Sequence, residues 1–268
     1  MKIPFLMVRM ILWNMQKAIE GGNGFFSRLL GCCFYDGARF TLLYYIVNRY
    51  RWLVGWDANQ VLFLFAFHLF TYSVSAAFCR GLCLSLPHRI QTGELDQAFI
   101  KPVHPLLYII FQEIDVKHLC RAPVALFAMC YAYGQINVVI SPISILLLSV
   151  MLVSALISQS ALWVAASALH FLVKGRNLFI AWIDVLSVFT RYPLQIYGTL
   201  IQVVLTFLVP LGFASYYPAS VIAGAATDLA FPRFLPYTAP MVGLLLMIGS
   251  VCFWRYASGR YQGVRKGN

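Results

Sequence analysis

Charged residues are scarce in this sequence. Asp, Glu, Lys and Arg make up only 11% of its 268 residues, against about 25% in an ordinary globular protein. Hydrophobic residues make up 61%, and the mean hydropathy is +0.76. A soluble fold of this length could not cover its surface with so few charges. The composition therefore excludes a soluble protein and predicts a chain that crosses the membrane several times.

Motifs of common enzyme classes are also missing. The sequence has no GxxxxGK[ST] loop that could hold the phosphates of ATP, and neither an H-E-x-x-H nor a G-x-S-x-G motif. The seven cysteines lie in or beside apolar segments, where thiols normally pack as small hydrophobic groups. We therefore expect no catalytic residue, no metal site and no disulfide in this chain.

The apolar segments are about 20 residues long, which favours membrane-spanning helices over a β-barrel. Six spans are predicted, at residues 29–48, 58–79, 119–138, 142–172, 194–213 and 237–254. They form one domain over residues 25–256, and too little chain remains for a large soluble domain. The predicted fold class is therefore an all-α integral membrane protein with six transmembrane helices.

The segments outside these spans have characters of their own. Residues 4–19, within the N-terminal region 1–24, are amphipathic and predict an interfacial helix. Residues 178–192 predict a second surface helix. Residues 214–236 leave too few positions between prolines for a span, so we expect an extracellular re-entrant hairpin there. Residues 257–268 form a basic tail.

The distribution of Lys and Arg predicts the orientation. One side of the predicted membrane holds sixteen of them, in the N-terminal 28 residues, the 80–121 loop, the 173–193 loop and the tail. The other side holds only three, namely Arg49, Arg51 and Arg233. Cytoplasmic loops collect Lys and Arg, so both termini are expected in the cytoplasm. The same rule explains the net charge of +11 without a nucleic-acid partner.

The longest polar stretch contains a short predicted helix. Thr92 can cap it, and Glu94 and Asp96 fall in its first turn, where the helix dipole favours anions. Lys101 is pushed out of the helical region by Pro102, which ends the helix. Its expected buried side chains are Leu95, Phe99 and Ile100. Two interpretations remain open, a helix held on the bilayer surface and a coupling element that docks into a cytoplasmic partner.

The end of the fifth predicted span contains several helix breakers. Pro210 removes an amide donor and Gly212 follows it, so a straight helix is not expected to continue. Tyr216 and Tyr217, followed by Pro218, suit the membrane interface. We predict that the helix breaks between 210 and 218 and that 219–231 returns part-way into the membrane, forming an outer gate.

Ionisable residues inside the predicted spans are few. Asp36 and Arg39 lie three residues apart on one face of the first span, where such groups usually face protein or water. They are interpreted as a structural ion pair, with a cargo contact and a gating latch as alternatives. His68, His170 and Asp184 are expected to be isolated polar groups at packing interfaces.

Four sequence blocks together resemble a known family. GWDANQVLFLFAF, RIQTGELDQAFIKPVHPL, RYPLQIYG and FLVPLGFASYYPA occur in this order at the distances found in ABC-2-type permeases of bacterial exporters. The resemblance runs from about residue 25 to 256. Its most specific part is the glycine, acidic pair and Lys-Pro of the second block.

The resemblance implies a function and partners. It implies the permease subunit of an exporter in the bacterial inner membrane, with ATP and Mg bound by a separate ATPase, expected in two copies, and a second permease chain that is the same or different. The expected ATPase-coupling residues are Gly93, Glu94, Leu95, Asp96, Phe99, Lys101 and Pro102. The expected path or gate residues are Asp36, Arg39, Pro210, Tyr216 and Tyr217.

The cargo is not named by the resemblance. The aromatic, apolar walls suit a hydrophobic or amphipathic substrate, and a surface that faces membrane lipid, the other expected partner, would have the same composition. The alternative function is a secondary carrier that couples transport to protons through Asp36 and Arg39. A membrane-embedded enzyme is disfavoured, because the loops show no cluster of His, Asp or Cys.

Overall fold

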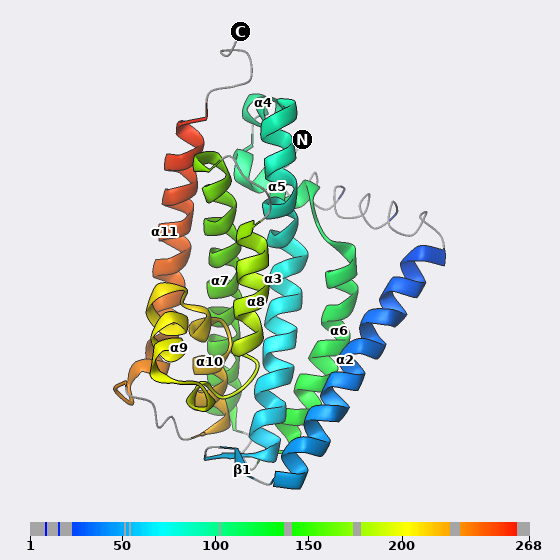
Figure 1. Cartoon of the computed structure of the whole chain (residues 1–268), viewed down its shortest axis with the longest axis vertical. Coiled ribbons are helices and arrows are strands. Elements are labelled where there is room, and N and C mark those ends of the chain that lie inside the picture. Colours follow the sequence, from blue (N-terminus) through cyan, green and yellow to red (C-terminus); the bar gives the residue numbers. More distant parts are fainter. Residues whose placement is uncertain are drawn as a thin grey trace.

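The computed structural model describes Arg9, Gln16 and residues 23–50, 52–53, 55–101, 103–136, 141–173, 178–225 and 231–261. Within these ranges the chain is almost entirely helical, and the long helices lie side by side in a bundle (Figure 1). The predicted interfacial helix at 4–19 lies outside the described residues, apart from Arg9 and Gln16, and so does most of the basic tail. The described part confirms an all-α architecture of membrane type.

The elements follow one another in a simple order. The first half of the chain contains α2 (Asn23–Tyr50), the two-residue strands β1 (Trp52–Leu53) and β2 (Trp56–Asp57), α3 (Ala58–Thr92), α4 (Glu94–Ile100), α5 (Pro105–Gln112) and α6 (Val116–Gly134). The second half contains α7 (Pro142–Leu172), α8 (Leu178–Phe189), α9 (Thr199–Val203), α10 (Tyr216–Ala223) and α11 (Ala239–Gly259). Short 3₁₀ or π-helical turns cover Leu194–Ile196, Val204–Leu208, Leu211–Ala214 and Leu235–Thr238.

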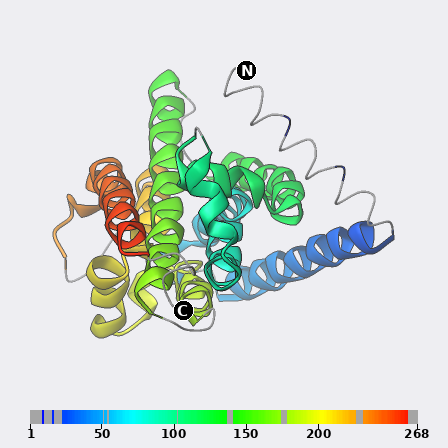
Figure 2. The ribbon, with the colours of Figure 1, turned by 90° about the horizontal axis from the view of Figure 1, so that it is seen from above.

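Helix α3 is the central element. Every residue from Val61 to Leu69 is buried, as expected for a helix that is apolar on all sides and enclosed by neighbours. Helices α6 and α7 pack against α3, and α11 packs against α7. Figure 2 shows that α2 lies at the edge of the molecule, where it contacts α3 and α6.

Three helical segments are long and apolar enough to cross a membrane, among the residues that the structure describes. They are Ala58–Thr92, Pro142–Leu172 and Leu235–Gly259. They correspond to the second, fourth and sixth predicted spans. The fourth span has the predicted bounds, because Ser141 caps its first turn and Pro142 occupies the first helical position.

Helix α3 continues well beyond its predicted end at residue 79. Its 35 residues extend about 52 Å, whereas the hydrocarbon layer is about 30 Å thick. Gly93, with φ of 75°, ends the helix in the left-handed conformation that favours glycine. The prediction ended where hydropathy falls, but the helix ends where the backbone turns.

Two predictions for the segment after α7 are wrong. Helix α8 is not a surface helix, because it runs along the bundle (Figure 1) with Ile180, Ile183 and Ser187 buried. The continuous fifth span predicted at 194–213 is also absent. The chain there forms a 3₁₀ turn, the five residues of α9 and a π-helical turn that ends at Leu208.

Candidate functional site

The predicted coupling helix exists as α4 at one end of the bundle (Figure 1). Gly93 joins it directly to α3 and serves as its N-cap. Thr92 does not cap α4 as predicted, because its hydroxyl donates to the carbonyl of His88 within α3. Leu95 and Ala98 are fully buried, in one hydrophobic cluster with Leu82, Leu86, Leu106, Ile109, Val164, Ala168, Trp254 and Ala257.

The outward surface of α4 is more apolar than predicted. Glu94 and Lys101 are exposed, as expected. Phe99 and Ile100 were predicted to be buried, but they are 43% and 83% exposed. The helix has only seven residues. One turn packs against the bundle, and the last two residues lie beyond this contact. Pro102 lies outside the described residues.

The end of α11 contacts this helix. The rings of Phe99 and Tyr261 stack with centroids 6.3 Å apart. Burial raises the pKa of Tyr261, and the nearby carboxylate of Asp96 raises it further. Asp96 is half-buried here, so its side chain belongs to the contact between α4 and α11 more than to the open surface.

The connection between α5 and α6 crosses α3 at close range and holds this end of the bundle together. Arg89 of α3 forms an ion pair with Glu113, in the connection between α5 and α6. The amide of Asp115 donates to the carbonyl of Ala77 at 2.9 Å. A Cβ on Gly81 would lie 1.9 Å from the carbonyl oxygen of Glu113. Only glycine permits this approach, which the sequence alone does not predict.

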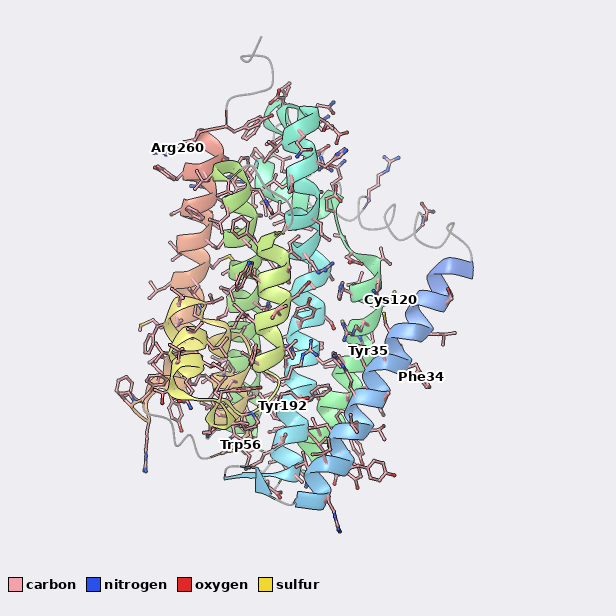
Figure 3. The ribbon with its side chains drawn as sticks, in the orientation of Figure 1. Phe34, Tyr35, Trp56, Cys120, Tyr192 and Arg260 are labelled. Carbon is pink, nitrogen blue, oxygen red and sulfur yellow. The ribbon has the colours of Figure 1, made fainter. Side chains whose placement is uncertain are left out.

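The predicted pair of Asp36 and Arg39 is wrong. Asp36 of α2 forms a two-pronged ion pair with Arg121 of α6, and both side chains are largely buried. The guanidinium of Arg39 lies over the ring of Tyr35 instead, 4.1 Å from its centroid. Tyr35, labelled on α2 in Figure 3, is itself 54% exposed. An arginine within the apolar run of α6 was the available signal for Arg121, which had been assigned to the preceding loop.

Asp184 and His170 are not isolated, contrary to expectation. Asp184 of α8 accepts hydrogen bonds from the hydroxyl of Tyr72 at 2.5 Å and from Arg80 at 3.1 Å, both on α3. His170 lies 3.6 Å from the thiol of Cys83. Arg80 had also been counted as a loop residue. The network ties α8 to the central helix.

His68 also has polar partners. Its Nδ1 lies 3.3 Å from the hydroxyls of both Ser215 and Thr190. The Nε of Arg191 donates to its Nε2 at 3.4 Å. The hydroxyl of Ser215 donates to the carbonyl of Thr190 at 3.1 Å. Residues from three distant parts of the sequence therefore meet around this buried ring.

The predicted break before α10 is confirmed. It begins at Val209, whose amide donates to the carbonyl of Val204 at 2.8 Å and closes the π-helical turn. Pro210 follows at the break, and a 3₁₀ turn covers Leu211–Ala214. A Cβ on Gly212 would lie 2.9 Å from the ring of Tyr217.

Tyr216 and Tyr217 do not form an exposed interfacial pair. They are the first residues of α10, which begins before residue 219, and both are fully buried. The Tyr216 hydroxyl donates to Gln195 at 2.8 Å, and the Tyr217 hydroxyl shares a hydrogen bond of 2.8 Å with Thr206. Helix α10 ends at Ala223, and residues 226–230 lie outside the described part, so the course of the predicted return beyond α10 is not observed.

Comparison with curated proteins and with solved structures gave no match. A family model described as ABC-2 family transporter protein matches residues 34–264. This range includes α3, α4 and the broken segment before α10. The chain therefore belongs to the ABC-2 transporter family.

Proposed function

We propose that this chain is the permease subunit of an ATP-driven exporter, and that α4 receives the motion of a separate ATPase. The observation that carries the proposal is the packing of α4 against the bundle. Its buried side chains, Leu95 and Ala98, lie in the same cluster as residues of α3, α5, α7 and α11. Cores of this kind are closely packed and transmit displacement. A force on α4 would therefore reach three membrane helices together.

The exposed part of α4 has the chemistry of a docking surface. Glu94 and Lys101 supply charges, and the exposed Ile100 supplies apolar area beside them. Interfaces between proteins commonly combine an apolar centre with a polar rim. The family membership supports an ABC ATPase as the occupant. That subunit, in two copies, would bind ATP and Mg, and this chain would have no catalytic role.

The proposed membrane arrangement has six crossings with both termini in the cytoplasm of a bacterial cell. Helices α2 and α6 would be crossings in addition to the three long apolar helices. The fifth would be discontinuous, made by α8 and the Thr199–Leu208 segment together. A second permease chain, the same or different, would complete the transporter.

The broken segment at 209–217 is the proposed outer gate. At membrane depth, the polar groups of irregular backbone must be hydrogen-bonded by protein or must line a cavity. In this segment Thr206 and Gln195 form hydrogen bonds with the two tyrosine hydroxyls. A hydrophobic or amphipathic cargo suits these aromatic surroundings. A proton-coupled carrier is not proposed, because it depends on a pair between Asp36 and Arg39 and Asp36 binds Arg121 instead.

Charge reversal on α4 tests this function. Glu94→Lys together with Asp96→Lys should abolish transport-linked stimulation of the ATPase while the protein still inserts. Replacing the exposed Glu94 should change the folding free energy by no more than about 0.5 kcal/mol. Reconstituted vesicles with the ATPase provide the measurement, and Gln135→Lys, exposed and outside α4, is the matched control. Undiminished stimulation in the double variant would mean that α4 is only a surface helix.

A further inference from the structure

A layer of charged side chains lies inside the bundle, nearer to the start of α3 than to its end. His68 follows Ala58, the first residue of α3, by ten positions, which corresponds to about 15 Å, and it lies within the buried run from Val61 to Leu69. The hydrogen bond from Asp115 to Ala77 sets the register of α6 against α3. Arg121, six residues further along α6, therefore lies near the depth of His68.

This layer carries an excess of positive charge. Arg39, Arg121 and Arg191 supply three guanidinium groups, and both carboxylate oxygens of Asp36 bind Arg121. Among the residues that the structure describes, no carboxylate lies within ion-pairing distance of Arg39 or Arg191. Arg39 belongs to this layer because the ring of its neighbour Phe40 contacts Phe65, three residues before His68, with the centroids 6.2 Å apart. Two guanidinium charges are therefore left uncompensated in the described part of this layer.

His68 does not neutralise Arg191. A guanidinium only donates hydrogen bonds, so the contact from Arg191 Nε identifies Nε2 of His68 as the acceptor. The ring hydrogen is then on Nδ1, which faces the hydroxyls of Thr190 and Ser215. His68 is therefore a neutral group that orients Arg191 through one nitrogen. The two terminal nitrogens of Arg191, with four N–H donors, are not used in this contact.

The backbone around Arg191 is irregular at a depth where helices are the rule. Arg191 follows the end of α8 and precedes the 3₁₀ turn at Leu194–Ile196, and Ser215 lies at the break before α10. Its neighbour Tyr192 packs against the main hydrophobic cluster and lies in the lower half of the bundle in Figure 3. Non-helical backbone at membrane depth occurs where it is buried in protein or lines a cavity. Uncompensated charges in a membrane mark paths for ions or substrates.

We propose that Arg191 anchors an oxyanion-binding site inside the membrane, and that Arg39, the other uncompensated guanidinium of this layer, adds positive charge to it. The ligand is the phosphate or carboxylate head group of an amphiphile. A planar guanidinium matches such groups through two parallel hydrogen bonds, and the surrounding apolar walls suit the chain attached to the head group. As a description of cargo, this inference rests on the proposed export function.

Binding to the full chain, without any ATPase, tests the site. The protein is placed in nanodiscs of phosphatidylcholine and titrated with fluorescent phosphatidylglycerol. Arg191→Gln should weaken binding about tenfold or more, the range for losing hydrogen bonds to a charged group. Arg191→Lys keeps the charge but loses the two parallel hydrogen bonds of the guanidinium, so it should give an intermediate loss of affinity. Arg233→Gln, which removes an exposed arginine, should bind as the unmodified protein does.

A second titration identifies the source of the oxyanion. Competition by millimolar inorganic phosphate that disappears in Arg191→Gln would show a site reached from water. Arg191-dependent lipid binding without such competition would show a site for a lipid head group. Equal lipid binding by the unmodified protein and Arg191→Gln, or binding of neither probe by the unmodified protein, would overturn the proposal.

Thermal melting of each variant separates binding from folding. If Arg191→Gln does not fold, Arg191→Lys and Arg39→Gln replace it, and unchanged binding in both would also overturn the proposal. These assays contain no ATPase. The oxyanion site can therefore be disproved while charge reversal on α4 still abolishes ATPase stimulation. The opposite result, Arg191-dependent binding without an effect of the α4 charges, would disprove only the proposed function.

Discussion

At the scale of single residues, the ion pair between Asp36 and Arg121 joins α2 to the rest of the bundle. This helix lies at the edge of the molecule in Figure 2, and Leu43 and Val47 also bury it against the bundle. A buried ion pair gives little net stability compared with apolar packing, but the loss of one partner leaves an uncompensated buried charge. The pair therefore determines where α2 packs more than it strengthens the fold.

Removal of either partner should be more damaging than removal of both. Arg121→Gln or Asp36→Asn should lower the free energy of unfolding by about 3–5 kcal/mol. The double variant should recover part of that loss, because no charge remains unpaired. Thermal melting in detergent and a double-mutant cycle measure both effects.

The exposed Lys117, also on α6, provides the control for this cycle. Lys117→Gln should change the free energy of unfolding by no more than about 0.5 kcal/mol. Losses that simply add in the double variant would show that Asp36 and Arg121 do not interact.

The sequence predicts the unusual position of Asp36 but not its partner. An aspartate inside an apolar run is conspicuous, and a local rule pairs it with a residue three positions away. Arg121 lies 85 residues away in the chain, so the pairing depends on how α2 and α6 pack. The same limit applies to Asp184 with Arg80 and to the ring of polar groups around His68.

At the scale of elements, the break before α10 depends on packing as well as on proline. Val209 closes a π-helical turn, and Pro210 has backbone angles that other residues can also adopt, with φ of −69° and ψ of 49°. Gly212 lies against the Tyr217 ring and within 3.2 Å of the Leu205 carbonyl, measured from an added Cβ. The segment is therefore fixed by contacts that a side chain at 212 would disturb.

Gly212→Ala should destabilise the outer segment. The added methyl group has no space, and such overpacking typically lowers the free energy of unfolding by about 1–3 kcal/mol. Gly249→Ala is the matched control, because an added Cβ there meets nothing within 4 Å and alanine favours a helix by about 0.5–1 kcal/mol. Melting temperatures should move in opposite directions, and equal shifts would contradict the packing argument.

Some elements can be predicted from the sequence because their causes are local. The break near Pro210 and the start of α7 at Pro142 follow from residues that remove a backbone donor or fix φ. The end of α3 could not be predicted in this way. Hydropathy falls at Arg80, but arginine is a good helix former, so the helix continues and stops only at Gly93, where φ is positive.

At the scale of the whole molecule, the orientation needs a new count of basic residues. Arg80, Arg121 and Arg191 were assigned to cytoplasmic loops, but they contact Asp184, Asp36 and His68 inside the bundle. Sixteen less these three leaves thirteen basic residues on the predicted cytoplasmic side, against three on the other. The excess of Lys and Arg on the cytoplasmic side remains after this correction, because only basic residues in the loops determine orientation.

Cysteine labelling in intact cells tests this orientation. In a cysteine-free background, single cysteines at Val54, Ile140 and Ala225 should react with a membrane-impermeant maleimide. Cysteines at Gln97, Gly175 and Gln262 should react only after the membrane is opened. The physical reason is the excess of Lys and Arg on the side that holds the last three sites. Two loops labelled from the opposite side would contradict both the six crossings and the placement of α4 in the cytoplasm, where an ATPase could reach it.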